Sequence, residues 1–407
     1  MFLRLAFSRL RTSELARPLL LYMGLLDELL TGFPTIALPL LRAQLGLDYV
    51  QIGLLFTVAA LAGMVIDPFV NLLSDRGSKK PWILGGLFLL AITTLLMGYV
   101  SSYPLLLLAF MLWFPANGAG VGLAQAALID FSPADGARIM TRWTMLSSVG
   151  DFLSPLVVAV FVASGRGWNG LCWLAAAAWF GMAVFLCLLR FPARPEQLPI
   201  VERREEARVS IRVGLREALR DPLLLRWAAL TLIPTMLDEV FLGFVALYLH
   251  DVLHLSEAWV ASILTLHMVA SFLGLFVLDQ LLKRRALAPV PVLFWLAIAT
   301  LLGVVALLLF HALWSTVVAL FVIGFCCAGW YPLAQAQAYA RRPNRSGLVR
   351  VVIGLGVPFE IILPGAVGLI SANFGMLAAL AFLGLAPVLV LLLLPYRHLR
   401  WQRGEEA

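Results

Sequence analysis

Twelve apolar runs divide this 407-residue chain, and each is about as long as a helix that crosses a membrane. A bilayer core takes about 20 helical residues. The chain is 62% hydrophobic and 13% charged, about half the charge of a soluble protein. This composition excludes a soluble enzyme, a disordered chain and a disulfide-rich module, and runs without polar alternation exclude an outer-membrane barrel. We predict an all-α membrane protein with transmembrane helices over 18–41, 50–73, 81–100, 104–129, 143–164, 168–189, 223–249, 258–282, 287–310, 312–339, 350–371 and 374–395.

The basic residues indicate how these helices are oriented. Of the 30 Lys and Arg residues, all but Arg42 and Arg166 lie on one side of the predicted spans. Cytoplasmic loops carry the excess of Lys and Arg, so we predict that both termini are cytoplasmic. Orientation in a membrane then explains the net charge of +7, and no nucleic-acid partner is expected. The basic clusters include Arg76, Lys79 and Lys80, then Arg138 and Arg142, the nine arginines from Arg190 to Arg226, and Arg341, Arg342, Arg345 and Arg350.

The opening segment and the cysteines add little to this assignment. The first residues include Arg4, Arg9 and Arg11 but no compact apolar core that ends in a cleavage site, so we predict a cytoplasmic tail, with an organelle transit peptide as the alternative. All four cysteines fall inside apolar runs without metal-ligand or redox spacing, and we expect them to pack as small apolar residues. The predicted location is the bacterial cytoplasmic membrane, and we expect a monomer in the lipid bilayer.

The two halves of the chain resemble each other. Three short patterns recur in corresponding spans at an offset of about 210 residues. They are Asp27-Glu28 with Asp238-Glu239, Leu123-Ala124-Gln125-Ala126 with Leu333-Ala334-Gln335-Ala336, and Asp151 and Pro155 with Glu360 and Pro364. Repeated halves of six spans are typical of transporters that bind their substrate near the membrane midplane. We predict two pseudo-symmetric six-helix bundles, 1–190 and 223–407, joined by a cytoplasmic linker over 191–222.

The loop after the second span carries a family signature. Ser74-Asp75-Arg76-Gly77-Ser78-Lys79-Lys80 resembles the Gly-x-x-x-Asp-Arg-x-Gly-Arg-Arg motif of the major facilitator superfamily, with Asn71 in place of the leading glycine. The chain is identified as a member on this resemblance, which implies two bundles that rock around a central site. It also implies a cytoplasmic gate of Asp75, Arg76, Lys79 and Lys80. We expect Arg142 to join this gate by pairing with Asp130 or Asp135.

Two further patterns point to different branches of that superfamily. Gly150-x-x-x-Ser154-Pro155 is similar to the Gly-x-x-x-Gly-Pro signature of drug:proton antiporters. Asp67-Pro68, followed by Ser74-Asp75-Arg76 and Lys80-Pro81-Trp82, resembles the sugar:cation symporters of the melibiose-permease group. That group has a second acid four residues before the Asp-Pro, where this chain has Gly63. The subfamily therefore stays open.

Seven acids are expected deep within the predicted spans, and no Lys or Arg is expected at their depth. They are Asp27, Glu28, Asp67, Asp151, Asp238, Glu239 and Glu360. A charged side chain at the membrane centre costs about 2.5–3.5 kcal/mol or more, so these acids should face a cavity or one another. Carboxyl groups that are buried or crowded together hold protons more tightly, as proton coupling requires. We predict that Asp27, Glu28, Asp151, Asp238, Glu239 and Glu360 line a coupling and substrate cavity; the alternative is that individual acids only hold helices together by hydrogen bonds.

Weaker candidates accompany these acids. Asp67, Gln125, Gln335 and Gln337 are secondary cavity candidates, and His267 either shuttles protons or is a neutral hydrogen-bonded histidine. His250 and His254 have a spacing that suits a metal, but no further ligands accompany them, so we predict no metal site. The run Gly118-x-Gly120-x-Gly122 lies within an apolar helix and is expected to allow close helix packing. No cofactor is expected.

These observations favour a proton-coupled secondary transporter that exports amphipathic or cationic compounds. The first alternative is a symporter, coupled to protons or sodium, that imports a sugar-like or other neutral solute. The second is a relative that transports nothing and serves in assembly or sensing. An enzyme is not expected, because no nucleophile, base and orienting group occur together.

Overall fold

A computed structural model describes residues 13–131, 135–189, 191, 211–284 and 288–396. The predicted Arg4, Arg9 and Arg11 tail, most of the linker over 191–222 and the basic C-terminal end from residue 397 lie outside these residues. The described part of the first half contains α2 (Ser13–Ile36), α3 (Leu38–Leu45), α4 (Tyr49–Ser74), α5 (Lys80–Tyr99), α6 (Tyr103–Asn117), η1 (Gly118–Gly122), α7 (Leu123–Asp130), α8 (Gly136–Ala163) and α9 (Gly167–Leu188).

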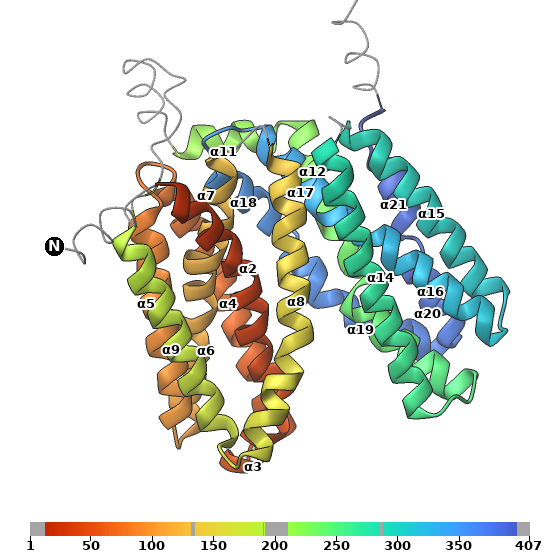
Figure 1. Cartoon of the computed structure of the whole chain (residues 1–407), viewed down its shortest axis with the longest axis horizontal. Coiled ribbons are helices and arrows are strands. Elements are labelled where there is room, and N and C mark those ends of the chain that lie inside the picture. The colour runs from red at the N-terminus through yellow and green to blue at the C-terminus, as the bar shows by residue number, and fades with distance from the viewer. Residues whose placement is uncertain (1–12, 132–134, 190, 192–210, 285–287, 397–407) are drawn as a thin grey trace, which may run out of the picture. The chain divides into compact units, whose positions relative to one another are not determined.

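The described part of the second half is helical as well, and neither half contains a strand within the described ranges (Figure 1). Its elements are α11 (Ile211–Leu219), α12 (Pro222–Leu232), η3 (Ile233–Leu237), α13 (Glu239–Leu247), η4 (Tyr248–Val252), α14 (Glu257–Arg284), α15 (Pro289–Leu309), α16 (Leu313–Cys327), α17 (Trp330–Ala340), α18 (Ser346–Gly354), α19 (Val357–Phe374), α20 (Met376–Leu383) and α21 (Ala386–Leu393).

The prediction of twelve membrane-spanning helices is confirmed. Among the described residues, 12 helical stretches are long and apolar enough to span a bilayer, so the chain is a multi-pass integral membrane protein. The two largest shifts toward an earlier start are in the fifth span, which begins at Gly136 rather than 143, and in the eleventh, which begins at Ser346 rather than 350. The early start of the fifth span carries Arg138 and Arg142, and the early start of the eleventh span places Arg350 inside the helix rather than at its first residue.

The chain forms two compact units, and the first residues of the fifth and eleventh spans each belong to the unit formed mainly by the other half of the chain. Unit 1 comprises the described residues of Met1–Ala134, Leu146–Leu215 and Arg342–Val351. Unit 2 comprises those of Asp135–Met145, Arg216–Arg341 and Val352–Ala407. The first turns of α8 therefore belong to unit 2, whereas most of α18 belongs to unit 1. The chain passes from one unit to the other within each of these two spans.

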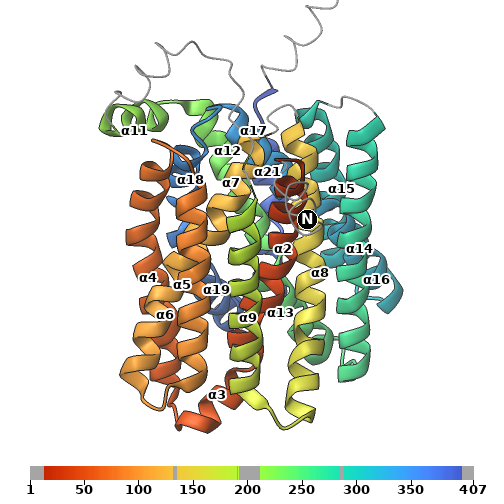
Figure 2. The same cartoon turned by 60° about the vertical axis from the view of Figure 1, so that its left-hand side comes forward.

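Unit 1 is built on close packing among its long helices. Helices α4, α5, α6 and α9 run side by side (Figure 2). α5 approaches η1 so closely that a Cβ on Gly86 would lie 2.7 Å from the Cα of Gly120. Only glycine fits where two helix backbones come this near, so the expected packing role holds for Gly120.

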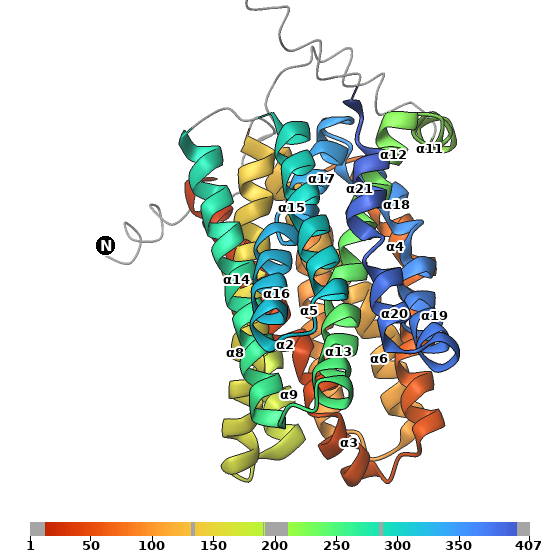
Figure 3. The same ribbon diagram turned by 90° about the vertical axis from the view of Figure 1, so that its right-hand side faces the viewer.

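Unit 2 follows the same pattern with different partners. α15 packs along α16, which also contacts α14, and α12 packs on α17 (Figure 3). The span that contains α12 is not one continuous helix: η3 follows α12, and α13 begins only after Asp238. The span predicted over 223–249 corresponds to Pro222–Val252, but the sequence did not predict its interruption at Asp238, where the backbone is not helical (φ −104°, ψ −130°).

Asp221 caps the start of this broken span. Its carboxylate accepts hydrogen bonds from the backbone N–H groups of Leu223 and Leu224, each 3.1 Å long, and an ion pair of 3.2 Å from Arg341. Burial raises the pKa of Asp221, but the hydrogen bond from Leu224 and the charge of Arg341 outweigh it and hold this pKa below its ordinary value. The folded state thus favours the ionised carboxylate.

We expect Asp221→Ala to lower the free energy of unfolding by about 1 kcal/mol at neutral pH, the usual value of a helix N-cap. Because the folded pKa is depressed, this contribution is complete above about pH 4, the ordinary pKa of aspartate, and disappears as the pH falls through the folded pKa. Thermal unfolding of the purified protein in detergent, measured from neutral to acidic pH, checks this. A difference between wild type and variant that grows on acidification would contradict it.

Candidate functional site

Asp27 has a neutral hydrogen-bond partner in the interior of unit 1. The side-chain amide of Asn117 donates to Asp27 Oδ1 at 2.7 Å, joining α2 to the end of α6. Directly after Asn117 the helix widens into the π-helical turn η1, a distortion that often occurs at functional sites. Sequence reasoning missed Asn117, although an asparagine inside an apolar helix and next to a glycine run was a usable signal.

The Gly150-x-x-x-Ser154 pattern brings Asp151 to the same region. A Cβ on Gly150 would lie 2.9 Å from the backbone nitrogen of Leu29, so α8 rests directly on α2 there. One turn further, a Cβ on Gly32 would lie 3.2 Å from the Cβ of Ser154. Asp151 is exposed and interacts electrostatically with Asp27. The pattern thus joins two helices and brings two carboxylates into electrostatic reach of each other.

A cation lies among these acids, which the sequence did not predict. Arg350 was assigned to a loop, yet it is part of α18, within a membrane-spanning stretch. Its guanidinium rests on η1, where a Cβ on Gly122 would lie 2.6 Å from the Arg350 Cζ. Arg350 interacts electrostatically with both Asp27 and Asp67. The prediction that no Lys or Arg lies at the depth of the acids is therefore wrong.

Unit 2 carries its acids at helix breaks. Asp238 is exposed and occupies the interruption between η3 and α13. Glu360 is exposed in the first turn of α19, just after the break that follows α18, and has a side-chain hydrogen bond with Thr235 of η3. Interrupted helices expose backbone polar groups inside the membrane and mark substrate sites in many transporters. Asp238 and Glu360 thus lie on neighbouring broken segments of one unit.

The remaining candidates are more enclosed. His267 is buried, and its Nδ1 lies 2.8 Å from the backbone oxygen of Leu320, which links α14 to α16. Gln125 and Gln335 are buried, and Gln335 donates to the hydroxyl of Tyr331 at 2.9 Å; Gln337 is half-buried. Glu28 is half-buried on α2, and Glu239 is the first residue of α13.

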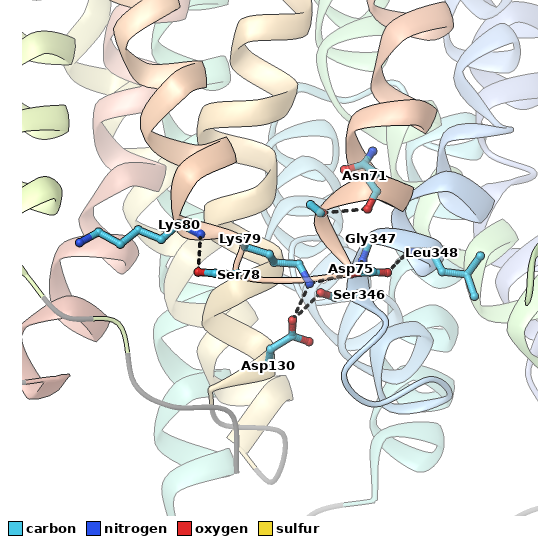
Figure 4. Close-up of polar contacts among 10 residues, drawn as sticks. Asn71, Asp75, Ser78, Lys79, Lys80, Asp130, Ser346, Gly347 and Leu348 are labelled. Carbon is cyan, nitrogen blue, oxygen red and sulfur yellow. Dashed lines mark hydrogen bonds and ion pairs between the residues drawn. The ribbon is translucent and has the colours of Figure 1, made fainter. Parts of the chain in front are cut away.

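A second polar cluster holds the segment Arg342–Val351 within unit 1 (Figure 4). The Asp75 carboxylate accepts hydrogen bonds from the backbone N–H groups of Gly347 (3.0 Å) and Leu348 (2.8 Å) at the start of α18. A carboxylate at a helix N-terminus is favourable because it binds free N–H groups and the positive end of the helix dipole. A Cβ at Gly347 would lie 2.9 Å from the Asp75 Cγ, so only glycine allows this approach.

Lys79 and Asp130 complete this cluster. The buried Lys79 ammonium contacts Asp75 at 2.7 Å and Asp130 at 2.9 Å, and the hydroxyl of Ser346 donates to Asp130 at 2.8 Å. The buried charges of Asp75, Lys79 and Asp130 compensate one another, and the hydrogen bonds stabilise them further. Removal of one of these charges would leave the others buried without compensation. We call Asp75, Lys79, Asp130 and the first turn of α18 the α18 seat.

Unit 2 contains a counterpart of this seat at the end of α14. Arg142 and Arg138, both in the part of α8 that belongs to unit 2, donate to the buried carboxylate of Asp279 at 2.8 and 3.1 Å. The expected pairing of Arg142 with Asp130 or Asp135 is wrong, because Asp130 is bound to Lys79 and Ser346.

The predicted gate also included Arg76 and Lys80, which are not part of the α18 seat. Arg76 is exposed. Lys80 donates to the backbone oxygens of Cys187 and Leu189, at 3.0 and 2.6 Å, where α9 ends. Lys80 therefore caps a helix rather than joining the α18 seat. Within the described ranges, no group of three or more His, Cys, Asp or Glu residues is placed to hold a metal ion.

Comparison with known proteins identifies this architecture. The chain is similar in structure to the E. coli fucose:proton symporter, with a TM-score of 0.79, 16% identity and coverage of 95% of this chain and 99% of the symporter. It is also similar to a human organic anion transporter, with a TM-score of 0.72, 16% identity and coverage of 94% and 99%. Identities this low support the fold alone.

Curated relatives match over a shorter stretch. A phosphoglycerate transporter protein of Salmonella typhimurium is 27% identical over 173 residues, which are 41% of this chain and 37% of that protein. A probable hexose phosphate transport protein of Chlamydia pneumoniae is 25% identical over 175 residues, 42% of this chain and 37% of that protein. The chain thus matches less than two fifths of the length of these relatives. The profile of the Major Facilitator Superfamily, in contrast, matches residues 20–355. With its twelve spans and this match over most of its length, the chain belongs to the Major Facilitator Superfamily.

Proposed function

We propose that this protein is a proton-coupled secondary transporter of a small, hydroxyl-rich solute, such as a sugar. The observation that carries the proposal is the Asp27–Asn117 pair in the interior of unit 1, with the carboxylate of Asp151 in electrostatic reach. A membrane carboxylate that has only a neutral hydrogen-bond donor can exist with or without a proton at modest cost. Such a group can bind a proton on one side of the membrane and release it on the other.

The charge balance around this pair favours a neutral solute over a phosphate ester. Seven acids are expected deep within the spans, and Arg350 is the cation that acts on Asp27 and Asp67. A phosphate group would meet more negative than positive charge at these residues, whereas sugar hydroxyls both donate to carboxylates and accept from amide and guanidinium groups. The similarity to the fucose:proton symporter agrees with this class, while the phosphoglycerate and hexose phosphate relatives make phosphorylated sugars the next compounds to test.

A second candidate is export of an organic cation in exchange for protons. The observation that favours it is the excess of exposed carboxylates at Asp151, Asp238 and Glu360. The relatives that match this chain are named for sugars, phosphate esters and organic anions, and none of these names supports export of amphipathic or cationic compounds. We therefore rank this candidate below the sugar-like solute.

The proposed cycle uses the two kinds of polar site in turn. Solute hydroxyls bind beside Asp27 when its carboxyl is protonated, and loss of the proton on the other side of the membrane weakens binding. The α18 seat and the Asp279 pair with Arg138 and Arg142 act as gates, because each fixes a segment that belongs by sequence to the other half of the chain. Their repeated breaking and closing accompanies each change of access.

The sign of proton movement in proteoliposomes distinguishes these candidates. We expect a downhill gradient of a sugar or sugar phosphate, added outside, to acidify the lumen, because symport carries protons inward with the solute. An organic cation that enters by antiport would make the lumen alkaline instead. A pH dye in the lumen reports both. Folded protein in tight vesicles that gives no signal with sugars, sugar phosphates, organic anions or cations would contradict proton-coupled transport.

A further inference from the structure

Asp67 and Arg350 lie against one face of the same helix. The carboxylate of Asp67 rests on Gly118, where a Cβ would lie 2.5 Å from its Oδ2. The guanidinium of Arg350 rests on Gly122, four residues further along η1. Positions four apart are neighbours on a helix, separated by about 5–6 Å. Two glycines thus make room for an acid and a base, one turn apart, in the interior of unit 1.

Each of these two side chains has a buried polar atom without a partner. Oδ1 of Asp67 and Nε of Arg350 are buried and make no hydrogen bond within the described part of the chain. No ion pair within 4.0 Å joins the two side chains, yet the positive charge of Arg350 acts on Asp67. Arg350 therefore compensates the carboxylate through space, without the direct contact that would hold the two groups together.

Few other charges act on Asp67. α6 and η1, which pack against α4, contribute no charged side chain among their residues. α2 contributes Asp27, on which Arg350 also acts. α18 contributes Arg350 itself. The ionised form of Asp67 thus depends on one cation, and that cation is carried by α18.

The position of Arg350 depends in turn on the α18 seat. Gly347 and Leu348, whose N–H groups bind Asp75, precede Arg350 by a single helical turn. When these bonds hold, Arg350 is fixed beside Gly122. If these bonds broke and α18 moved, the guanidinium would leave with it, whereas Asp67 would remain on α4.

We propose that Asp67 is a second proton-binding site, which is ionised while α18 is seated and binds a proton when α18 leaves. This rests on the proposed proton-coupled function and assigns one of its protons. A carboxylate in a low-dielectric interior takes up a proton once its counter-charge is removed. Each release of α18 thus binds one proton at Asp67, and each return of Arg350 displaces it, which couples proton movement to the gate.

The surroundings of Asp67 favour a proton over a sodium ion at this site. A Cβ on Gly63 would lie 3.9 Å from Oδ2 of Asp67, so an acid there would reach the same site. The chain has glycine instead and brings Arg350 to Asp67. The nearby guanidinium repels a metal cation, and a single carboxylate offers such a cation few ligands, whereas one carboxylate is enough to bind a proton once the guanidinium departs.

Hydrogen–deuterium exchange of the full-length protein in lipid nanodiscs tests this. Exchange of residues 346–354, corrected for the intrinsic rate, is compared at about pH 8 and about pH 6. For wild type we expect more exchange at the lower pH, because protonated Asp67 no longer attracts the charge of Arg350. Asp67→Asn and Arg350→Gln should lose this pH dependence, while Arg350→Lys should keep it.

Two controls keep the result interpretable. Asp48→Asn removes an acid from the N-cap of the same helix, where Asn caps equally well, and should behave as wild type. Exchange of α5 should be unchanged in every variant if the fold is intact. A pH dependence that persists in Asp67→Asn would overturn the proposal. Because the experiment uses no solute, this failure is distinct from a silent solute panel, which would contradict the proposed transport instead.

Discussion

Asp27→Asn is expected to lower the number of protons that move with each solute molecule while the protein stays folded. Asparagine has nearly the volume of aspartate, and its carbonyl oxygen can still accept the hydrogen bond from Asn117, which measures 2.7 Å in the structure. The variant therefore keeps the helix contact but cannot bind or release a proton. Substrate binding should remain, because the amide still offers a donor and an acceptor to solute hydroxyls.

Lumenal pH and solute uptake are measured together in proteoliposomes to check this. Uptake down a solute gradient should continue in Asp27→Asn, whereas uphill accumulation driven by a pH gradient should fall well below that of the wild type. Asp48→Asn is the matched control, since Asp48 is an exposed acid at the start of α4, away from the Asn117 contact. Normal uphill accumulation by Asp27→Asn would show that this carboxylate is structural.

Asp75→Ala is expected to slow turnover by about tenfold or more without loss of solute binding. The substitution removes the hydrogen bonds to Gly347 and Leu348 and one partner of the buried Lys79. A hydrogen bond to a charged group contributes about 1.5–3 kcal/mol, and about 1.4 kcal/mol corresponds to a factor of ten in rate. The α18 seat would then no longer stabilise the state of the transport cycle in which α18 is bound to it, and the return to that state would slow turnover.

Turnover and equilibrium binding of the transported solute separate this role from others. Arg76→Ala is the matched control, because Arg76 follows Asp75 directly but is exposed. We expect Arg76→Ala to transport at close to the wild-type rate. A loss of binding in Asp75→Ala would place Asp75 in the substrate site and contradict a role confined to the gate.

The spans could be predicted from sequence because membrane insertion depends on length and apolarity alone. The breaks within them could not. Pro234 precedes the interruption at Asp238, but proline occurs inside several continuous helices here, including α4 with Pro68 and α8 with Pro155. Tertiary packing, rather than the local sequence, decides which proline-containing span is interrupted.

The acids were recognisable because a carboxylate inside an apolar run is costly and therefore conspicuous. Their partners were not. Asn117 carries no charge, and Arg350 lies only four residues from Ser346, where α18 begins, so by position it reads as part of a basic loop. The glycine run was interpreted as helix packing, which holds for Gly120, whereas Gly118 and Gly122 accommodate charged side chains. Which neighbour a glycine accommodates depends on segments far away in the chain.

The exchange of segments between the two units bears on how the chain matures during synthesis. Unit 1 includes Arg342–Val351, which the ribosome makes after most of unit 2, and Asp75 has no backbone partner from α18 until then. The first six spans therefore enter the bilayer with a buried lysine and two acids that await their last ligand. A truncated chain that ends before Ser346 would keep these charged groups without their partners on α18. Membrane quality control can then recognise an unfinished chain by its uncompensated charges.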